Sequence, residues 1–228
     1  MRILAADIGG TKTVLQLAEV ESGAVRPGHR QLVASQRFPD VAALLEAFLA
    51  GAAAGAIDAA CLAVAGPVTG GRAQVTNLGW QVDAGELAAR FRIGRVSLLN
   101  DFAAVGYGIE TLGPDELAVL QAGTAEALAP RGVIGAGTGL GMGLVVWTGD
   151  RHLVLASEGG HVDFAPVDNE QVQLLRFLWR RQERVSCERL LSGAGLVQIF
   201  EFACERAGAQ PVPALAEAVA PGAPAEAL

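Results

Sequence analysis

Residues 98–108, with the sequence LLNDFAAVGYG, join the end of a predicted strand to the start of a predicted helix. Two leucines precede the adjacent polar residues Asn100 and Asp101, and small and apolar residues then recur at helical spacing. We therefore expect this polar pair at the carboxyl end of a strand, where open α/β sheets bind their ligands. The pair also suits a purely structural role, because Asn and Asp are favoured at helix N-termini.

The composition of the 228-residue chain predicts a well-buried α/β protein. Hydrophobic residues make up 51% of it and charged residues 18%, and its 29 glycines favour tight turns and close backbone contact with a ligand. The net charge of −7 argues against binding to nucleic acid or to an anionic membrane. The three cysteines are widely spaced, which fits neither a disulfide framework nor a Cys-x-x-Cys metal site and favours the cytoplasm. We expect no signal peptide and no membrane-spanning segment.

A tight hairpin is predicted at the start of the chain, with strands over residues 2–7 and 13–19. The turn between them has the sequence DIGGTK, from Asp7 to Lys12. Its glycines let backbone amides face a phosphate, Thr11 adds a hydroxyl and Lys12 adds a positive charge. Asp7 is placed to hold a magnesium ion through water. An ordinary hairpin loop with a surface lysine is the alternative.

A second glycine-dense turn is predicted within residues 133–143, which have the sequence VIGAGTGLGMG. A strand precedes the turn and another follows it as far as Trp147, and Thr138 lies among the glycines. Two such units in one chain suggest two phosphate-binding hairpins that face each other. A dinucleotide-binding fold fits poorly, because Leu140 occupies the position of the third glycine of G-x-G-x-x-G and the residues that follow suit a strand rather than a helix.

Residues 157–164, with the sequence SEGGHVDF, place acidic side chains and an imidazole around two glycines. Metal binding by Glu158, His161 and Asp163 is one interpretation. Hydroxyl recognition fits better, because a carboxylate accepts hydrogen bonds from two neighbouring hydroxyls and a neutral imidazole donates one. A loop held together by its own side chains is the structural alternative.

The remaining segments predict a mixed sheet flanked by helices, with a domain boundary near residue 110. Trp80 is expected to be a packing residue in a polar loop with Asn77, and Ser186 is expected to cap a short helix that carries Glu188. A further short helix is expected over residues 214–219. The other predicted strands cover residues 59–65, 72–76, 95–99 and 152–156, and the other predicted helices cover residues 40–54, 85–91, 114–120, 169–181 and 196–206.

Taken together, five stretches of the chain resemble the bacterial glucokinases of the hexokinase and actin-like ATPase superfamily. The resemblance implies an α/β protein of two domains with the actin-like, ribonuclease H-like fold, in which mixed sheets flanked by helices surround a cleft. Residues 1–110 would form the small domain and residues 111–228 an incomplete large domain. The five stretches are residues 7–12, 99–108, 135–143, 158–166 and 186–195.

The resemblance also implies a role for each matching residue in ATP-dependent phosphorylation of glucose. Asp101 would be the general base on the 6-hydroxyl, and Asp7 would contact Mg²⁺ through water. The residues that would bind the sugar are Asn100, Asp101, Glu158, His161 and Glu188. The residues that would bind the nucleotide are Ala6, Asp7, Ile8, Gly9, Gly10, Thr11 and Lys12 from one side, and Gly137, Thr138 and Gly139 from the other. A cytoplasmic homodimer is the assembly that the resemblance implies.

Two departures from the family pattern affect these expectations. Lys12 stands where many members have Asn. The sequence DIGGTK also occurs in the related group of repressors, open reading frames and sugar kinases, but this chain lacks the cysteine-rich zinc motif of that group. The chain also ends at Leu228, before the adenosine-binding segment that the pattern places further on. We therefore expect an incomplete nucleotide pocket and poor phosphorylation of glucose. A non-catalytic sugar-binding protein or sensor on the same scaffold is the main alternative, and an NAD-linked oxidoreductase is a weaker one.

Overall fold

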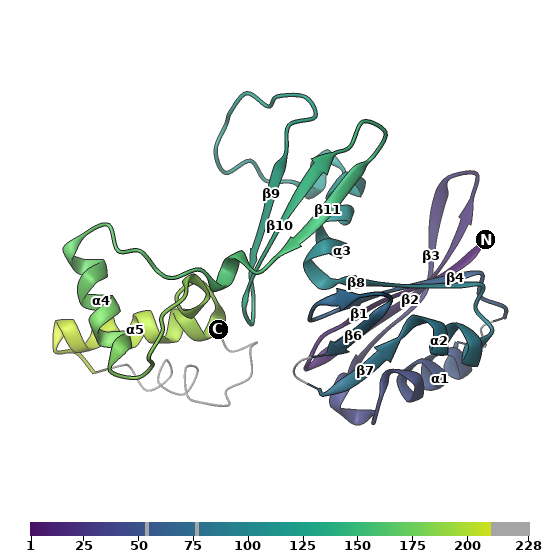
Figure 1. Cartoon of the computed structure of the whole chain (residues 1–228), viewed down its shortest axis with the longest axis horizontal. Helices are drawn as coiled ribbons and strands as arrows, with labels where there is room; N and C mark the ends of the chain where they lie inside the picture. The colour runs from purple at the N-terminus through teal and green to yellow at the C-terminus, as the bar shows by residue number, and fades with distance from the viewer. Residues whose placement is uncertain (53–54, 76–77, 211–228) are drawn as a thin grey trace. The chain divides into compact units, whose positions relative to one another are not determined.

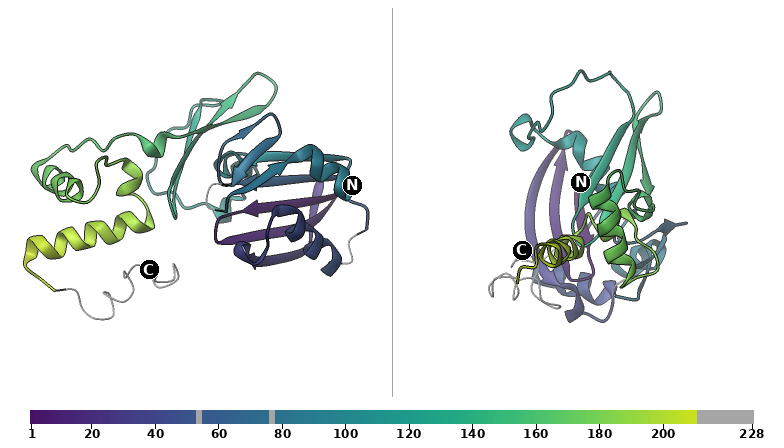
Figure 2. Two further views of the ribbon diagram at one scale, coloured as in Figure 1. Left: turned by 60° about the horizontal axis from the view of Figure 1, so that its bottom comes forward. Right: turned by 90° about the vertical axis from the view of Figure 1, so that its left-hand side faces the viewer.

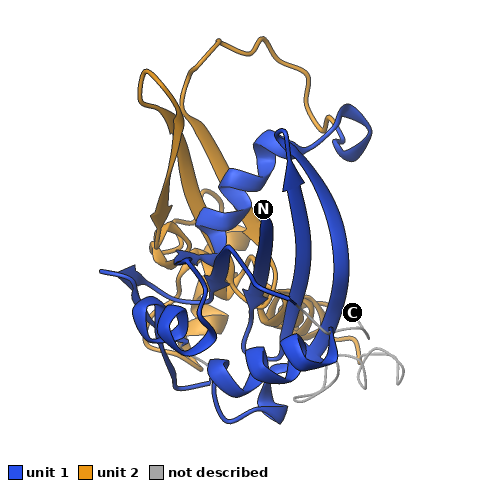
Figure 3. Ribbon diagram, turned by 90° about the vertical axis from the view of Figure 1, so that its right-hand side faces the viewer, with its two compact units in different colours: residues 1–118 blue, residues 119–228 orange. Residues whose placement is uncertain are grey.

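The chain forms two compact units, Met1–Ala118 and Val119–Leu228 (Figure 3). The computed structural model describes residues 1–52, 55–75 and 78–210, so the predictions for Asn77 and for a helix over residues 214–219 lie outside the described residues. Each unit contains its own β-sheet and helices. Within the described ranges, no helix is long and apolar enough to cross a membrane.

The first unit is built on a five-stranded mixed sheet, which confirms the predicted sheet type. Strand β1 is antiparallel to β2, β2 is antiparallel to β3, and β4 lies parallel to both β1 and β8. The third strand, β3, was not predicted. In the order β3-β2-β1-β4-β8, the strands are β3 (Ala24–Ala34), β2 (Lys12–Glu21), β1 (Arg2–Ile8), β4 (Ala59–Val64) and β8 (Arg95–Asn100).

Helices α1 (Val41–Gly51) and α2 (Ala84–Phe91) lie on one side of this sheet, and α3 (Asp101–Gly108) lies on the other (Figure 1). Alternate strand residues point toward α1, as the two-residue period of a strand requires. The resulting core includes Leu4, Ile8, Leu15, Leu62 and Val64 from the strands and Val41, Leu44 and Phe48 from α1. Side chains of Asp40 and Asp83 cap α1 and α2 by accepting backbone amide hydrogens.

Two local predictions for the first unit differ from the structure: Trp80 packs in the core as predicted but lies in a strand rather than in a polar loop, and a predicted helix is absent. Trp80 begins strand β7 (Trp80–Asp83) of a small sheet with β5 (Val68–Thr69) and β6 (Arg72–Val75), and its buried side chain joins the core. The helix expected over residues 114–120 is only a single 3-10 turn at Pro114–Glu116. Val119 and Leu120 are 80% and 97% exposed, so this segment lacks the apolar packing that stabilises a short helix.

The second unit contains the three-stranded antiparallel sheet β11-β10-β9, in which β9 is Arg131–Ala136, β10 is Leu140–Trp147 and β11 is His152–Ser157. Helices α4 (Asn169–Trp179) and α5 (Gly193–Ala207) lie side by side (Figure 2). Their aromatic rings Phe177 and Phe202 meet with centroids 5.6 Å apart.

The segment between α4 and α5 differs from its prediction. The short helix expected after Ser186 is a single 3-10 turn, Cys187–Arg189, and Ser186 makes no side-chain capping bond to it. Ser192 is the residue that caps α5, because its hydroxyl accepts the Gly195 amide hydrogen at 3.1 Å. Glu188 therefore lies in a short connection between helices, only a few residues before the start of α5.

Candidate active site

The turn between β1 and β2 is braced by two buried hydroxyl groups. Gly9 closes the turn by donating its N–H to the carbonyl of Lys12 at 3.1 Å. Ser35 Oγ donates to the Gly9 carbonyl at 2.7 Å and lies 2.9 Å from Thr13 Oγ1. Both hydroxyl side chains are fully buried, so two neutral groups inside the first unit brace this turn. A Cβ at Gly9 would lie 2.9 Å from the Lys12 carbonyl, which explains the glycine.

Asp7 and Asp101 lie close together at the carboxyl ends of two parallel strands. β1 and β8 both pair with β4, where Ala63 is opposite Asp7 on one side and Leu99 on the other. The Asp7 side chain reaches solvent, yet its partial burial raises the pKa of its carboxyl group, and the charge of Asp101 raises that pKa further. The edge of the sheet therefore holds two carboxyl groups that repel each other when ionised.

Asn100 and Asp101 have separate structural roles at the start of α3. Asn100 Oδ1 accepts the Ala103 amide hydrogen at 3.1 Å, and its Nδ2 donates to the Gly66 carbonyl at 3.3 Å. Asn100 is therefore the capping residue, as the sequence allowed. Asp101 occupies the first helical position, where its Oδ1 accepts the Phe102 amide hydrogen at 2.9 Å. The Asp101 side chain is partly exposed, and Asn100 rather than Asp101 supplies the capping bond to Ala103.

The first turn presents different groups at successive residues. Ala6 and Ile8 bury their side chains in the core, so only their backbone groups are available to a nucleotide. Thr11 and Lys12 are exposed. The alternation follows from the strand period and places the polar residue Asp7 on the opposite face from Ala6 and Ile8.

The second turn, Gly137 to Gly139, is held by residues that lie about 50 positions further along the chain. Gly137 donates its N–H to the Gly139 carbonyl at 2.8 Å, and the Gly137 carbonyl accepts from the Gly193 amide at 2.9 Å. Glu188 Oε2 accepts the Leu140 amide hydrogen at 3.1 Å. The exposed residues Gly137 and Thr138 form the tip of the turn. Neither contact across the chain was predicted from the sequence.

Glu158, His161 and Glu188 form a cluster beside this second turn. His161 Nε2 lies 3.7 Å from Glu158 Oε2, and His161 Nδ1 lies 3.6 Å from Glu188 Oε1. These separations are longer than hydrogen bonds, so the three groups keep bonding capacity for a ligand. The cluster combines acceptors and a donor, as recognition of neighbouring hydroxyls requires. We name Glu158, His161 and Glu188 the hydroxyl cluster.

The metal interpretation of residues 158–163 receives no support from the structure. Asp163 Oδ1 accepts a hydrogen bond from Arg184 Nε at 2.7 Å, in an ion pair outside the hydroxyl cluster. Within residues 1–52, 55–75 and 78–210, no group of three or more His, Cys, Asp or Glu side chains is arranged to hold a metal ion. Hydroxyl recognition therefore remains the better interpretation of this loop.

Glycines bring the loop of the hydroxyl cluster directly against strand β10. A Cβ at Gly160 would collide with the Leu140 carbonyl, and one at Gly159 would lie 2.7 Å from Met142 Sδ. The 3-10 turn Gly159–His161 therefore packs on the same residue, Leu140, whose amide bonds to Glu188. The second glycine turn and the hydroxyl cluster therefore pack against the same strand of the second unit.

The residues that the sequence missed are those that hold the first turn in place. Ser35 lies in a segment for which no element was predicted, and Thr13 was predicted only as part of a strand. Their pairing depends on β3, which returns the chain to the first turn, where the Ser35 amide donates to the Thr11 carbonyl at 2.9 Å. A serine directly after the edge strand is too common a feature to have been found by pattern alone.

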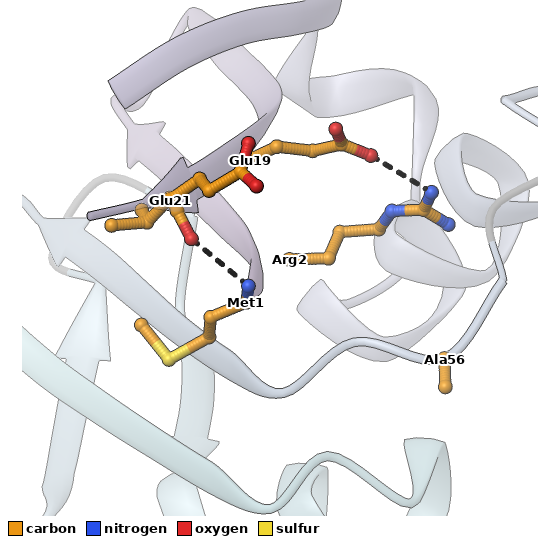
Figure 4. Close-up of a pocket in the computed structure, with 6 residues that line it drawn as sticks. Met1, Arg2, Glu19, Glu21 and Ala56 are labelled. Carbon is orange, nitrogen blue, oxygen red and sulfur yellow. Dashed lines mark hydrogen bonds and ion pairs between the residues drawn. The ribbon is translucent and has the colours of Figure 1, made fainter. Parts of the chain in front are cut away.

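A separate pocket of about 380 Å³ lies at the opposite end of β1 (Figure 4). The ammonium group of Met1 donates to the Val20 carbonyl at 3.0 Å, and Arg2 Nη2 donates to Glu19 Oε1 at 3.1 Å. Its other lining residues are Glu21 and Ala56. Because β1 has seven residues, about 20 Å of strand separates this pocket from the first turn. The pocket is therefore not part of the candidate site.

Comparison with known proteins agrees with these features. The family model described as "Glucokinase" matches residues 4–227. A glucokinase from a Nostoc species is 43% identical over 221 residues, which cover 95% of this chain but only 65% of the relative. The chain therefore spans slightly less than two thirds of the length of that relative.

Solved structures confirm the predicted actin-like fold. The crystal structure of a glucokinase from an Antarctic psychrotroph superposes with a TM-score of 0.78 at 31% identity, covering 92% of this chain and 66% of that one. A glucokinase from Balamuthia mandrillaris, crystallised in complex with glucose, gives a TM-score of 0.70 at 23% identity, covering 92% and 64%, and shows the fold alone. With the family model matched along almost its whole length, the chain belongs to the glucokinase family.

Proposed function

We propose that the chain carries the glucose-phosphorylating site of an ATP-dependent hexose kinase. The observation that supports this most is the hydroxyl cluster, which is bonded through Glu188 to a glycine turn of the phosphate-binding type. Family membership points to the same reaction, and the Balamuthia mandrillaris relative was crystallised with glucose. The proposed products are glucose 6-phosphate and ADP.

In the proposed mechanism, Asp101 accepts the proton of the glucose 6-hydroxyl as its oxygen attacks the γ-phosphorus of ATP. A bond forms between that oxygen and phosphorus, and the bond to the β–γ bridging oxygen breaks, so that ADP leaves with the electron pair. A positioned base of this kind contributes roughly 10²–10⁴-fold to the rate. Asn100 supports the base by fixing the start of α3, where Asp101 is the first residue.

The same proposal gives the hydroxyl cluster and Asn100 the task of orienting the sugar. Glu158 and Glu188 would accept hydrogen bonds from sugar hydroxyls, and His161 would donate or accept one according to its tautomer. Backbone amides of the turns at Gly9–Thr11 and Gly137–Gly139 would face the phosphates. These donors make the overall negative charge of the chain compatible with an anionic nucleotide.

Asp7 would hold Mg²⁺, most simply through water. The raised pKa of Asp7 shows that its ionised form is opposed by burial and by Asp101, and a divalent cation offsets that opposition. Mg²⁺ is commonly bound by one or two carboxylates together with substrate phosphates and water, so a single Asp beside a phosphate turn suits it. When bound, the ion neutralises charge on the transferring phosphate.

Titration calorimetry with glucose and an assay of ADP release test this proposal. We expect glucose to bind the chain and the ADP release, which the sequence predicts to be slow, to depend on glucose. Binding without ADP release would favour the alternative, a non-catalytic sugar-binding protein. Absence of glucose binding would contradict the proposed function.

Two parts of the prediction rest on sequence alone. The homodimer follows only from the family resemblance, and sedimentation equilibrium is the direct measurement of it. The cytoplasmic location is the compartment that the odd number and wide spacing of Cys61, Cys187 and Cys204 favour.

A further inference from the structure

We propose that Glu188 is a positioning residue that couples the hydroxyl cluster to the second glycine turn. The inference rests on the proposed function, because it concerns how sugar binding at that cluster affects the shape of the Gly137–Gly139 turn. A sugar hydroxyl bound to the Glu188 carboxylate would affect the conformation of the turn, because the same carboxylate bonds to the Leu140 amide.

The two oxygens of Glu188 face different parts of the candidate site. Oε2 accepts the Leu140 amide hydrogen at 3.1 Å, and Oε1 lies 3.6 Å from His161 Nδ1. The side chain as a whole is 28% exposed, and Oε2 is engaged with the backbone. A hydroxyl that bonds to Oε1 restricts the orientation of the whole carboxylate, because both oxygens belong to one rigid planar group.

The Leu140 amide depends on this partner because of the hairpin geometry. Gly137 and Gly139 bond to each other inside the hairpin, so in an antiparallel ladder the next pair, Ala136 and Leu140, directs its amides outward. The first residue after the turn therefore obtains its hydrogen bond from Glu188. Loss of the carboxylate would leave this amide without that acceptor at the base of the turn.

Gly139 provides the space that the Glu188 carboxylate occupies. A Cβ at Gly139 would lie 2.5 Å from Glu188 Oε2 and 3.3 Å from Cδ, and its nearest neighbours within 4 Å all belong to this one side chain. The absence of a side chain at Gly139 is therefore explained by Glu188. A methyl group there would displace a flexible carboxylate rather than the backbone.

The first experiment measures amide hydrogen exchange at Leu140 by NMR, in the 228-residue chain without ligand. We expect Glu188→Ala to accelerate exchange at this amide by roughly 10-fold or more, since hydrogen bonds to charged groups contribute that much stability. Glu188→Gln, which keeps an acceptor oxygen, should retain most of the protection. Equal exchange rates in the wild type and Glu188→Ala would overturn the proposal.

The second experiment is a double-mutant cycle on glucose affinity, with Gly139→Ala and Glu188→Ala. If Gly139 acts through Glu188, the added methyl weakens glucose binding about 10-fold in the wild type and less than about twofold when Glu188 is already alanine. Equal losses in both backgrounds would mean that the methyl simply distorts the turn, and would overturn the proposal. Gly132→Ala is the control, because a Cβ at this position of β9 meets nothing within 4 Å.

The coupling itself is measured by adding saturating glucose to the NMR sample. We expect the Leu140 amide to become more protected in the wild type and to remain unchanged in Glu188→Ala. A wild-type amide that does not respond to bound glucose would overturn the coupling. If the wild type binds no glucose, the proposed function fails, whereas the exchange comparison without ligand still decides whether Glu188 holds the turn.

Discussion

The two glycine turns are similar in sequence but are held by different kinds of group. The first turn is braced by Ser35 and Thr13, two fully buried neutral hydroxyls. The second is braced by Glu188, a partly exposed carboxylate that also belongs to the hydroxyl cluster. Each unit thus contains a glycine turn, which is braced by neutral hydroxyl groups in the first unit and by a carboxylate in the second.

This difference indicates that the two units have different roles in the proposed reaction. The first unit holds the proposed base and a turn that is braced by two buried neutral hydroxyl groups. The second holds the hydroxyl cluster, which is proposed to bind the sugar, and a turn whose backbone bonds to one member of that cluster. Substitutions in the two units are therefore expected to have separable effects on turnover, stability and sugar binding.

Asp101→Asn is expected to have the largest effect, on turnover. Removal of the proton acceptor should lower glucose-dependent ADP release by roughly 10²–10⁴-fold, because Asn cannot take the proton of the 6-hydroxyl. Glucose affinity and the thermal unfolding midpoint should change little. If the 228-residue chain turns over too slowly to measure, the variant is made in a family member of full length. Unchanged turnover would contradict the assignment of the base.

Ser35→Ala tests the brace of the first turn. The substitution leaves the buried Gly9 carbonyl and the Thr13 hydroxyl without their partner, so the free energy of unfolding should fall by about 1–3 kcal/mol. Urea denaturation measures this change. Thr124→Ala, at an exposed position, is the control and should stay within about 0.5 kcal/mol of the wild type. Equal stability of Ser35→Ala and the control would show that the buried hydroxyls do not brace the turn.

Asp7→Asn tests how much the ionised Asp7 carboxylate, which is partly buried and close to Asp101, destabilises the folded first unit. Because the folded-state pKa of Asp7 is raised above 3.8, the folded chain binds this proton more tightly than the unfolded chain does. The wild type therefore loses stability as the pH rises from about 3.8 through the raised pKa. Above that range Asp7→Asn should be the more stable protein, by about 2–4 °C at most, since Asp7 is partly solvated.

Thermal melts of both proteins from pH 3 to pH 7 measure this difference. The two melting points should converge at the acidic end, where Asp7 is protonated in the folded and unfolded states alike. A variant that is less stable than the wild type at pH 7 would contradict the stated direction of the pKa shift.

Local sequence patterns predicted most of the elements that position the candidate site. The glycine turns, the strand that ends at Asn100 and the helix after it are each encoded within about ten residues, and the structure contains them all. The contacts that support the turns were missed because they come from far along the chain. Ser35 is 26 residues from Gly9, and Glu188 is 48 residues from Leu140. Such contacts depend on the fold rather than on any local pattern.

Packing decided the remaining differences between prediction and structure. Trp80 packs in the core as predicted, but from a strand that pairs with β6 rather than from a loop. Residues 114–120 form no helix, and Val119 and Leu120 are 80% and 97% exposed. Roles carried by the family resemblance, such as that of Asp101 as base, remain predictions. The structure adds to them the reason why Asn100, rather than Asp101, caps α3.

The two sheets also differ in how completely they are covered. The first has a core with α1 along one face, whereas one face of β9–β11 presents Ile134, Leu144 and Leu155, which are 60%, 47% and 47% exposed. Leu144 and Leu155 are direct cross-strand partners, so their side chains form a contiguous apolar surface. Exposed apolar surface of this kind promotes self-association.

Leu144→Lys is expected to have the smallest effect on folding and to act mainly on association. The side chain is already half exposed, so the free energy of unfolding should change by no more than about 0.5 kcal/mol. Light scattering at increasing protein concentration should show less association than in the wild type. Val145→Lys, on the opposite and buried face, is the matched comparison and should unfold the second unit. If Leu144→Lys associates as strongly as the wild type, this sheet face is not the surface responsible, and the contrast between the two sheets has no consequence for the isolated chain.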